Sequence, residues 1–168
     1  MTTDYMNRAL SLAEKAVGNV SPNPAVGAVI VKNGVIVGEG FTLPPGSSHA
    51  EIVALEQAGK SAQGASLYVT MEPCGHFGRT PSCTEAIISS GIKTVHMAMS
   101  DPNPIVSGKG KKQLEKSGIS VSEGEQQQKA EKLNEAYVKF ITGGTPFVIA
   151  KYAMSLDGKI ATRTGDSR

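Results

Sequence analysis

The residues best able to bind a metal, His49, Cys74 and Cys83, are far apart in the chain, so a fold that uses them together must bring distant segments to one point. One imidazole and two thiols can hold a tetrahedral zinc ion and leave its fourth position open for water, as in catalytic zinc sites. Glu51 is then a spare carboxylate, which hydrolytic chemistry uses to move protons beside a zinc-bound water. The pattern predicts one Zn²⁺ per chain, with His49, Cys74 and Cys83 as metal ligands and Glu51 as the catalytic residue.

Each of these residues also has a simpler explanation. His49 could be an ordinary helix-start histidine, Glu51 could serve only in a capping box with Ser48, and the two thiols could be inert and buried. Two observations favour the interpretation as metal ligands over these simpler explanations. Cys83 falls in the first turn of a predicted helix, where unpaired N–H groups lower a thiol pKa, and Cys74 follows a strand end. The order H-x-E, then P-C and a second cysteine, also matches zinc nucleobase deaminases, although the spacing here is C-x8-C and not C-x-x-C.

Hydrophobic periodicity and turn residues predict helices alternating with strands after an initial hairpin, which favours an α/β domain whose later strands are parallel. The hairpin turns at Asn33-Gly34, the dipeptide best suited to a two-residue turn. Two prolines hold Asn23 in an extended loop. His49 is expected at the irregular entrance of its helix, because residues two apart on a regular helix point away from each other. Helices are expected at residues 6–17, 48–58, 80–90 (with Thr80 as N-cap), 108–117 and 126–142, and strands at 25–32, 35–40, 66–70, 93–99, 119–121 and, as a strand-like run, 147–153.

Length and composition limit the class of protein. A chain of 168 residues can hold one complete domain and the beginning of a second. With 17 basic and 15 acidic residues, no tryptophan, four tyrosines and four phenylalanines, the composition does not indicate the basic groove and stacking aromatics that usually bind single-stranded nucleic acid. There is no apolar run of membrane-spanning length, and residues 1–5 lack the pattern of a secretory signal. We therefore expect a cytoplasmic protein that binds neither nucleic acid nor a membrane.

Residues 73–83, P-C-G-H-F-G-R-T-P-S-C, closely resemble the P-C-x-H-x-G-[RK]-T-P-x-C motif of the riboflavin-biosynthesis pyrimidine deaminases, the N-terminal domain of the bifunctional deaminase–reductase. The resemblance extends from Tyr5 to about Gly144 and includes residues 22–27, 49–51 and 101–104. It departs at Thr42, where that family usually carries a histidine, so a substrate contact at this position stays open. Residues 147–161 look like the first strand of the same family's reductase domain.

The resemblance implies a cytidine deaminase-like, three-layer αβα fold with a central mixed sheet of about five strands. It implies a zinc-dependent deaminase domain at residues 1–145 and, at 146–168, the opening segment of a truncated reductase domain that is not expected to bind NADPH. The implied reaction is hydrolytic deamination of a small-molecule pyrimidine ribosyl-phosphate, 2,5-diamino-6-(ribosylamino)-4(3H)-pyrimidinone 5′-phosphate, in riboflavin biosynthesis. For this substrate we expect contacts from Asn23, His76, Arg79 and Asn103. The Arg79 guanidinium is the first candidate to bind the phosphate and Asn103 is the second. Asn23 is suited to the ring or ribose, and His76 is expected to line the pocket.

Two other functions stay open. A tRNA- or single-strand-directed nucleobase deaminase would share the zinc chemistry, although the weak charge and few aromatics argue against it. A non-catalytic, zinc-stabilised binding module would normally use four protein ligands, whereas this pattern offers three ligands and an unused glutamate. The sequence leaves homo-oligomer formation open.

Overall fold

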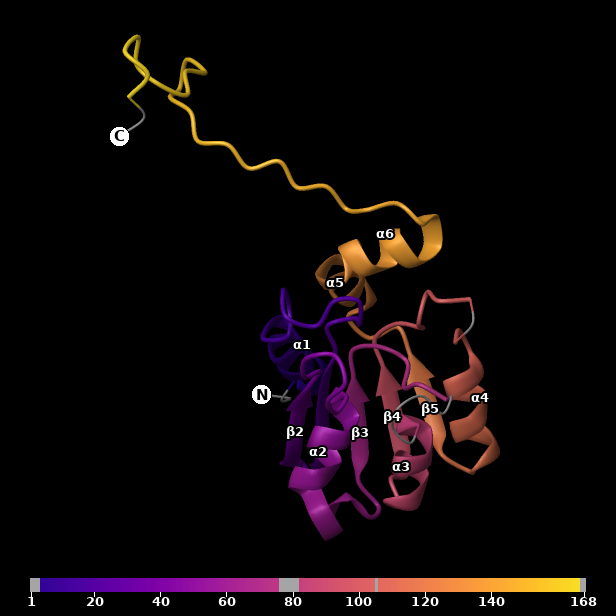
Figure 1. The fold of residues 1–168 in the computed structure, drawn as a ribbon. Coiled ribbons are helices and arrows are strands. Elements are labelled where there is room, and N and C mark those ends of the chain that lie inside the picture. The colour runs from indigo at the N-terminus through magenta and orange to yellow at the C-terminus, as the bar shows by residue number, and fades with distance from the viewer. Residues whose placement is uncertain (1–3, 76–81, 105, 167–168) are drawn as a thin grey trace.

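The computed structural model of the chain describes residues 4–75, 82–104 and 106–166. Within these residues five strands form one sheet in the order β2-β1-β3-β4-β5, which confirms the predicted α/β class (Figure 1). The strands are β1 (Gly27–Lys32), β2 (Val35–Phe41), β3 (Ser66–Val69), β4 (Thr94–Met97) and β5 (Ser120–Glu123). The helices are α1 (Tyr5–Glu14), α2 (Ala50–Ala58), the 3₁₀ helix η1 (Gly59–Ala62), α3 (Cys83–Ser89), α4 (Lys109–Lys116), α5 (Gln127–Leu133) and α6 (Glu135–Gly143).

The sheet is mixed, as predicted. Strand β1 is antiparallel to β2 and to β3, whereas β3, β4 and β5 run parallel to one another. The β1–β2 hairpin turns at Asn33 and Gly34, whose φ angles of 52° and 77° suit a two-residue turn with both central residues left-handed. A register shift between Ile30 and Val31 interrupts the hairpin ladder, and the sequence pattern does not reveal it.

Helices cover both faces of the sheet, which gives the predicted three layers. Helices α2 and α3 lie on one face, with α4 beside β5, and α1 lies on the other face next to α5 (Figure 1). Gly27 faces α1, whereas Gly40, the β2 partner of Ala28, faces α2, because successive residues of β1 point to opposite faces. A Cβ atom at Gly27 would lie 1.9 Å from the Ala9 oxygen, and one at Gly40 would lie 2.3 Å from the Ala50 oxygen. Glycine thus lets both helices pack directly on the backbone of the sheet.

The loops that carry the predicted site leave the sheet at one edge. Because β1 and β3 are antiparallel, the residues before Gly27 lie beside those after Val69. The end of β2, at Phe41, pairs with Gly27, and the end of β4, at Met97, pairs with Val69. Residues 20–26, 42–49, 70–75 and 98–104 therefore meet at the carboxyl edge of the parallel strands, where α/β sheets commonly bind ligands.

Two helix predictions were wrong in part. The single helix expected at residues 126–142 is divided into α5 and α6, because Asn134 adopts φ −104° and ψ 19° between them. The helix expected to be capped by Thr80 begins at Cys83, and its N-cap is Ser82, whose Oγ accepts a hydrogen bond from the Glu85 N–H at 3.3 Å. Residues 80 and 81 lie outside the described residues.

Two expected extended segments also differ. Residues 147–153 form no strand, and they run exposed away from the domain, because a strand requires a neighbouring strand for its backbone hydrogen bonds (Figure 1). Residues 20–23 form a turn and not an extended loop, closed by a hydrogen bond from the Asn23 N–H to the Val20 oxygen at 2.7 Å. The Ser21–Pro22 peptide bond within this turn is cis, which the sequence does not specify. Among the described residues, no helix combines the length and the apolar character needed to cross a membrane.

Candidate metal centre

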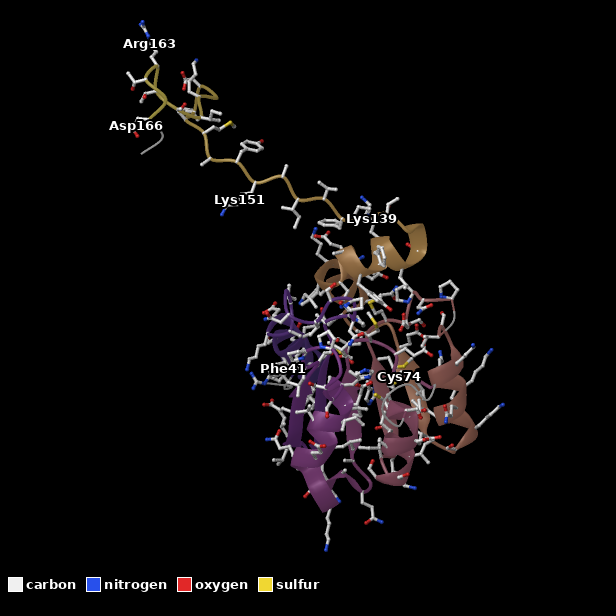
Figure 2. The ribbon with its side chains drawn as sticks, viewed as in Figure 1. Phe41, Cys74, Lys139, Lys151, Arg163 and Asp166 are labelled. Atoms are coloured by element: carbon white, nitrogen blue, oxygen red, sulfur yellow. The ribbon has the colours of Figure 1, made fainter. Side chains whose placement is uncertain are left out.

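The three predicted ligands come together from three separate segments, and we call them the metal cluster. His49 precedes α2, Cys74 lies on the loop after β3, and Cys83 is the first residue of α3. The ligand atoms of the three side chains all lie within 4.8 Å of one another, and they are the one such group of His, Cys, Asp and Glu found in the part of the chain that the structure describes. Figure 2 marks Cys74 in the body of the domain, whereas Lys151 and Arg163 lie on the tail.

The spacing of the cluster fits a zinc ion. Nδ1 of His49 lies 3.3 Å from Sγ of Cys83 and 3.7 Å from Sγ of Cys74. Ordinary Zn–N and Zn–S distances and a tetrahedral angle place a nitrogen and a sulfur ligand about 3.6 Å apart. Two thiols and an imidazole are also ligands that zinc favours. The residues present therefore fit the predicted metal in both chemistry and geometry.

The backbone at His49 explains how His49 and Glu51 can face the same site. His49 is the N-cap of α2, with φ −74° and ψ 164°, so it precedes the helical turn, which confirms the predicted irregular entrance. The predicted capping box is wrong. Helix α2 begins at Ala50, so Glu51 is its second residue, whereas a capping box requires the third. The Glu51 side chain is instead buried, with 4% of its surface exposed.

The two sulfurs are coupled by hydrogen bonds. The Cys83 N–H donates to Sγ of Cys74 at 3.4 Å, and the side-chain hydrogen bond with Cys83 lowers the pKa of the Cys74 thiol. The same side-chain hydrogen bond, and then burial, raise the pKa of the Cys83 thiol. The hydrogen bond therefore favours the thiolate form at Cys74 over that at Cys83. A divalent cation bound by both sulfurs would favour the thiolate form of each.

Glu51 is a buried carboxyl beside this charge. Burial, and then the charge of Cys74, raise the pKa of Glu51 to about 7, while His49 acts in the opposite direction. A carboxyl with a pKa near neutrality can both accept and return a proton at neutral pH. Glu51 is not a member of the metal cluster, so its carboxyl remains available for proton transfer.

Glu72, which the sequence analysis did not single out, fixes the loop that carries Cys74. Its carboxylate is 5% exposed and accepts three backbone N–H groups: Oε2 accepts those of Asp101 at 3.3 Å and Gly108 at 2.9 Å, and Oε1 accepts that of Lys111 at 3.1 Å. The loop after β3 is thereby joined to the loop after β4 and to the start of α4, where a helix favours negative charge. The signal in the sequence is an acidic residue directly before the Pro-Cys pair.

Two of the four predicted substrate contacts lie at the same edge of the sheet as the metal cluster. Asn23 is half-buried on the turn before β1. Asn103 lies on the turn after β4, where its N–H donates to Oδ1 of Asp101 at 2.9 Å. His76 and Arg79 lie outside the described residues. Asp101 was not singled out either, and burial raises the pKa of its carboxyl.

Thr42, the residue at which the sequence departs from the family motif, has a structural role in this fold. The side chain is 4% exposed. Its Oγ1 accepts the Val26 N–H at 3.2 Å, and its own N–H donates to the Val26 oxygen at 2.9 Å. The hydroxyl therefore helps to close the β1–β2 ladder next to the turn of Asn23.

Comparisons with known proteins agree with the geometry. Residues 1–99 match the family described as the cytidine and deoxycytidylate deaminase zinc-binding region. The chain is 54% identical over 165 residues to the riboflavin biosynthesis protein RibD of Aquifex aeolicus, a match that covers 98% of this chain and 46% of that protein. With RibD of Escherichia coli it shares 48% identity over 164 residues, covering 98% of this chain and 45% of that protein.

A solved structure shares the fold. The diaminohydroxyphosphoribosylaminopyrimidine deaminase/5-amino-6-(5-phosphoribosylamino)uracil reductase of Thermotoga maritima aligns with a TM-score of 0.91 at 50% identity, over 98% of this chain and 48% of that one. This likeness confirms the fold that the sequence motifs imply. The chain spans about half the length of the curated relatives it matches, with 46% and 45% of those two RibD proteins covered.

Proposed function

The chain belongs to the cytidine and deoxycytidylate deaminase zinc-binding family, and from this premise we propose that it is a zinc-dependent hydrolase that deaminates an amino-pyrimidine in riboflavin biosynthesis. The observation that carries the proposal is the convergence of His49, Cys74 and Cys83 beside the buried carboxyl of Glu51. Three protein ligands leave one tetrahedral position for water, and the glutamate lies outside the ligand group.

The proposed chemistry assigns each of these side chains a role. His49, Cys74 and Cys83 hold the zinc ion, which when bound supplies a Lewis acid that lowers the pKa of a water molecule to about 7. Glu51 accepts a proton from the attacking water and returns it to the departing amine. A C–O bond forms at the ring carbon as its C–N bond breaks, so one water is consumed and one ammonia is released.

The proposed substrate is 2,5-diamino-6-(ribosylamino)-4(3H)-pyrimidinone 5′-phosphate. The name of the Thermotoga maritima relative, a diaminohydroxyphosphoribosylaminopyrimidine deaminase and a reductase, supports this choice. Asn23 is proposed to contact the ring or ribose, and Asn103 is proposed as a second candidate for the phosphate contact, because their turns leave the sheet at the edge that holds the metal cluster. His76 is proposed to line the pocket and Arg79 to bind the phosphate with two hydrogen bonds.

We further propose that the deaminase domain ends near residue 145 and that residues 146–168 open a second domain, without binding NADPH by themselves. The support is the exposure of apolar side chains along this tail. Val148 is 77% exposed, Ile149 79% and Leu156 108%, and large apolar side chains normally pack against a core.

A paired substitution tests the function. Glu51→Gln should retain about one zinc per chain but lose turnover by about 100-fold or more, measured as ammonia release from the proposed substrate. Glu56→Gln is the matched control, because Glu56 is exposed on the same helix, and it should leave turnover unchanged. Turnover near that of the wild type in Glu51→Gln would remove the proposed role of this carboxyl, and a wild-type chain that releases no ammonia would refute the function.

A further inference from the structure

The residue between α5 and α6 makes a contact far along the chain. Asn134 is 3% exposed; its Oδ1 accepts the Ala25 N–H at 2.8 Å, and its Nδ2 donates to the oxygens of Ala25 at 3.0 Å and Ala130 at 3.3 Å. An asparagine at the start of a helix ordinarily caps that helix with its side chain, yet Asn134 makes no such bond to α6. The amide instead holds Ala25, two residues after Asn23 and 109 residues away in sequence.

A second side chain, from the first turn of α6, contacts the loop after β4 that carries Asn103. Tyr137 lies in the first turn of α6, and its hydroxyl donates to Oδ1 of Asp101 at 3.1 Å. The same oxygen accepts the Asn103 N–H, so one carboxylate oxygen links Tyr137 to the turn of Asn103. Burial, and then the charge of Asp101, raise the pKa of Tyr137, so the hydroxyl keeps its proton and remains a donor.

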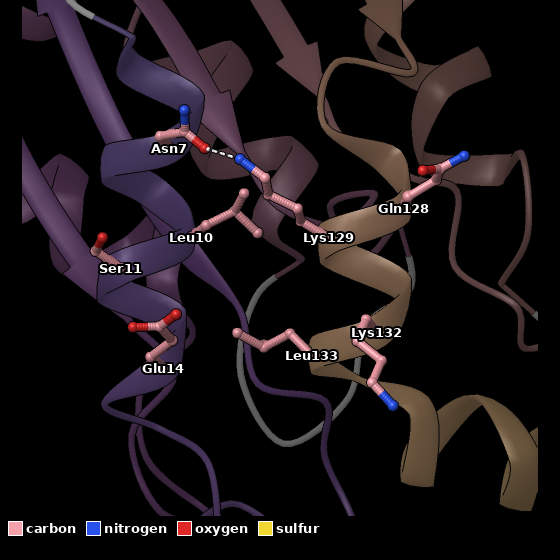
Figure 3. Close-up of a pocket in the computed structure, with 8 residues that line it drawn as sticks. All are labelled: Asn7, Leu10, Ser11, Glu14, Gln128, Lys129, Lys132 and Leu133. Carbon is pink, nitrogen blue, oxygen red and sulfur yellow. Dashed lines mark hydrogen bonds between the residues drawn. The ribbon is translucent and has the colours of Figure 1, made fainter.

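Elsewhere in this helix pair, Ala130 of α5 is fully buried in the main core, and Val138 of α6 packs against that core. None of the residues of α6 is buried. Figure 3 shows a groove between α1 and α5, crossed by the hydrogen bond from Nζ of Lys129 to Oδ1 of Asn7 at 2.9 Å. Leu133, next to Asn134, packs against the small apolar cluster that flanks the turn of Asn23, made of Ala16, Val20 and Ala25. The hydrogen bonds that join the pair to the loops at the carboxyl edge of the sheet thus come from Asn134 and Tyr137.

We propose that Asn134 and Tyr137 are positioning residues, which hold the turns of Asn23 and Asn103 against the edge where the metal cluster lies. This inference rests on the proposed function, since it assigns the two turns to the substrate. The metal cluster is carried by α2, α3 and the loop that Glu72 fixes, and among the described residues no hydrogen bond joins Asn134 or Tyr137 to a ligand side chain. Tyr137 reaches the loop of Glu72 only through Asp101, and Glu72 is also held by the N–H groups of Gly108 and Lys111. We therefore expect the two side chains to affect substrate binding more than metal binding.

Tyr137→Phe is the mildest test, because it removes one hydroxyl and keeps the ring. The KM for the proposed substrate should rise about fivefold to tenfold, as expected for the loss of one hydrogen bond. Both kcat and zinc content should stay within about twofold of the wild type, since the reacting groups are untouched. Tyr152→Phe is the matched control: Tyr152 is 69% exposed on the tail, so the substitution should change neither constant.

Double-mutant cycles separate positioning from a general structural effect. In an Asn103→Ala background, Tyr137→Phe should raise the KM no further. In an Asn23→Ala background, its full effect on KM should persist. Asn134→Ala should raise the KM no further in the Asn23→Ala background, whereas in the Asn103→Ala background its full effect on KM should persist. An unchanged KM in Tyr137→Phe, a loss of zinc, or the same cost in both backgrounds would overturn the inference. A wild-type chain that binds zinc but does not deaminate the substrate would refute the proposed function itself, and with it this inference.

Discussion

Replacement of Gly110 by alanine tests whether the loop of Cys74 depends on close contact with α4. Gly110 is buried in the first turn of α4. A Cβ atom there would lie 2.0 Å from the oxygen of Pro73 and 3.2 Å from Oε1 of Glu72. Pro73 directly precedes Cys74, so relief of this overlap requires the helix or the ligand-bearing loop to move. The substitution should therefore weaken both the fold and the metal cluster.

The size of the effect follows from opposing contributions. Helix propensity alone favours alanine over glycine by about 1 kcal/mol. Overpacking a dense interior costs about 1–3 kcal/mol, and a shift of α4 would also weaken the bonds from Gly108 and Lys111 to Glu72. Hydrogen bonds to a charged group contribute about 1.5–3 kcal/mol each. Overpacking with one weakened bond outweighs propensity, so we expect Gly110→Ala to lower the free energy of unfolding by about 2–4 kcal/mol.

Gly143→Ala provides the matched control, because the nearest atom to a Cβ atom there is Oγ1 of Thr145 at 3.6 Å, an ordinary contact. It should be neutral or slightly stabilising. Urea unfolding followed by circular dichroism gives the two free energies, and competition with a chromogenic chelator gives the zinc affinities. Gly110→Ala should lower both quantities and Gly143→Ala neither. Equal values for the two variants would refute the claim that α4 supports the loop of Cys74 through this contact.

The remaining tests concern the metal, the phosphate and an ion pair. Cys83→Ser should reduce zinc from about one equivalent by elemental analysis, and full retention would contradict its assignment as a ligand. Arg79→Ala should cost about 2 kcal/mol in kcat/KM with the phosphorylated substrate and nothing with the dephosphorylated one; a phosphate preference that survives would move the phosphate site elsewhere. The hydrogen bond from Arg8 lowers the pKa of Glu39. Arg8→Ala should therefore reduce stability by about 0.5 kcal/mol at pH 7. Thermal melts should show the difference in stability between wild type and variant closing as the pH falls through the lowered pKa of Glu39. A difference that persists in acid would show that the ion pair is not its source.

The parts of the fold that could be predicted are those with local causes. Asn33-Gly34 fixes a two-residue hairpin by its own backbone preferences, and the structure has that turn. Helices alternating with strands imply parallel pairing, which β3, β4 and β5 have. The sequence also singled out the three residues of the metal cluster, because their chemistry limits what they can do together. Their assignment as metal ligands stays a prediction, and so does the domain boundary near residue 145.

The parts that could not be predicted depend on partners distant in sequence. The apolar spacing of residues 126–142 continues through Asn134 without a break, and the division into α5 and α6 accompanies a bond to Ala25 on another element. The place of Glu72 before the Pro-Cys pair marks it in the sequence but does not reveal its three donors, which come from a loop and a helix start more than 25 residues later. A sequence pattern describes neighbours along the chain, so contacts of this kind appear only in three dimensions.

Glu51 shows why one sequence rule can fit two roles. The spacing from Ser48 suits a capping box, which would leave the carboxylate near the surface, but α2 begins at Ala50 and the side chain is buried. Burial raises the pKa of Glu51, so the fold disfavours its charged form, and such departures from local rules are expected where function requires them. Glu51→Gln should therefore keep or raise the free energy of unfolding, by up to about 1 kcal/mol, while turnover falls. Urea unfolding of Glu51→Gln beside the exposed control Glu56→Gln measures this. A loss of more than about 1 kcal/mol relative to the control would mean that the fold itself requires the Glu51 carboxylate, as a structural role predicts.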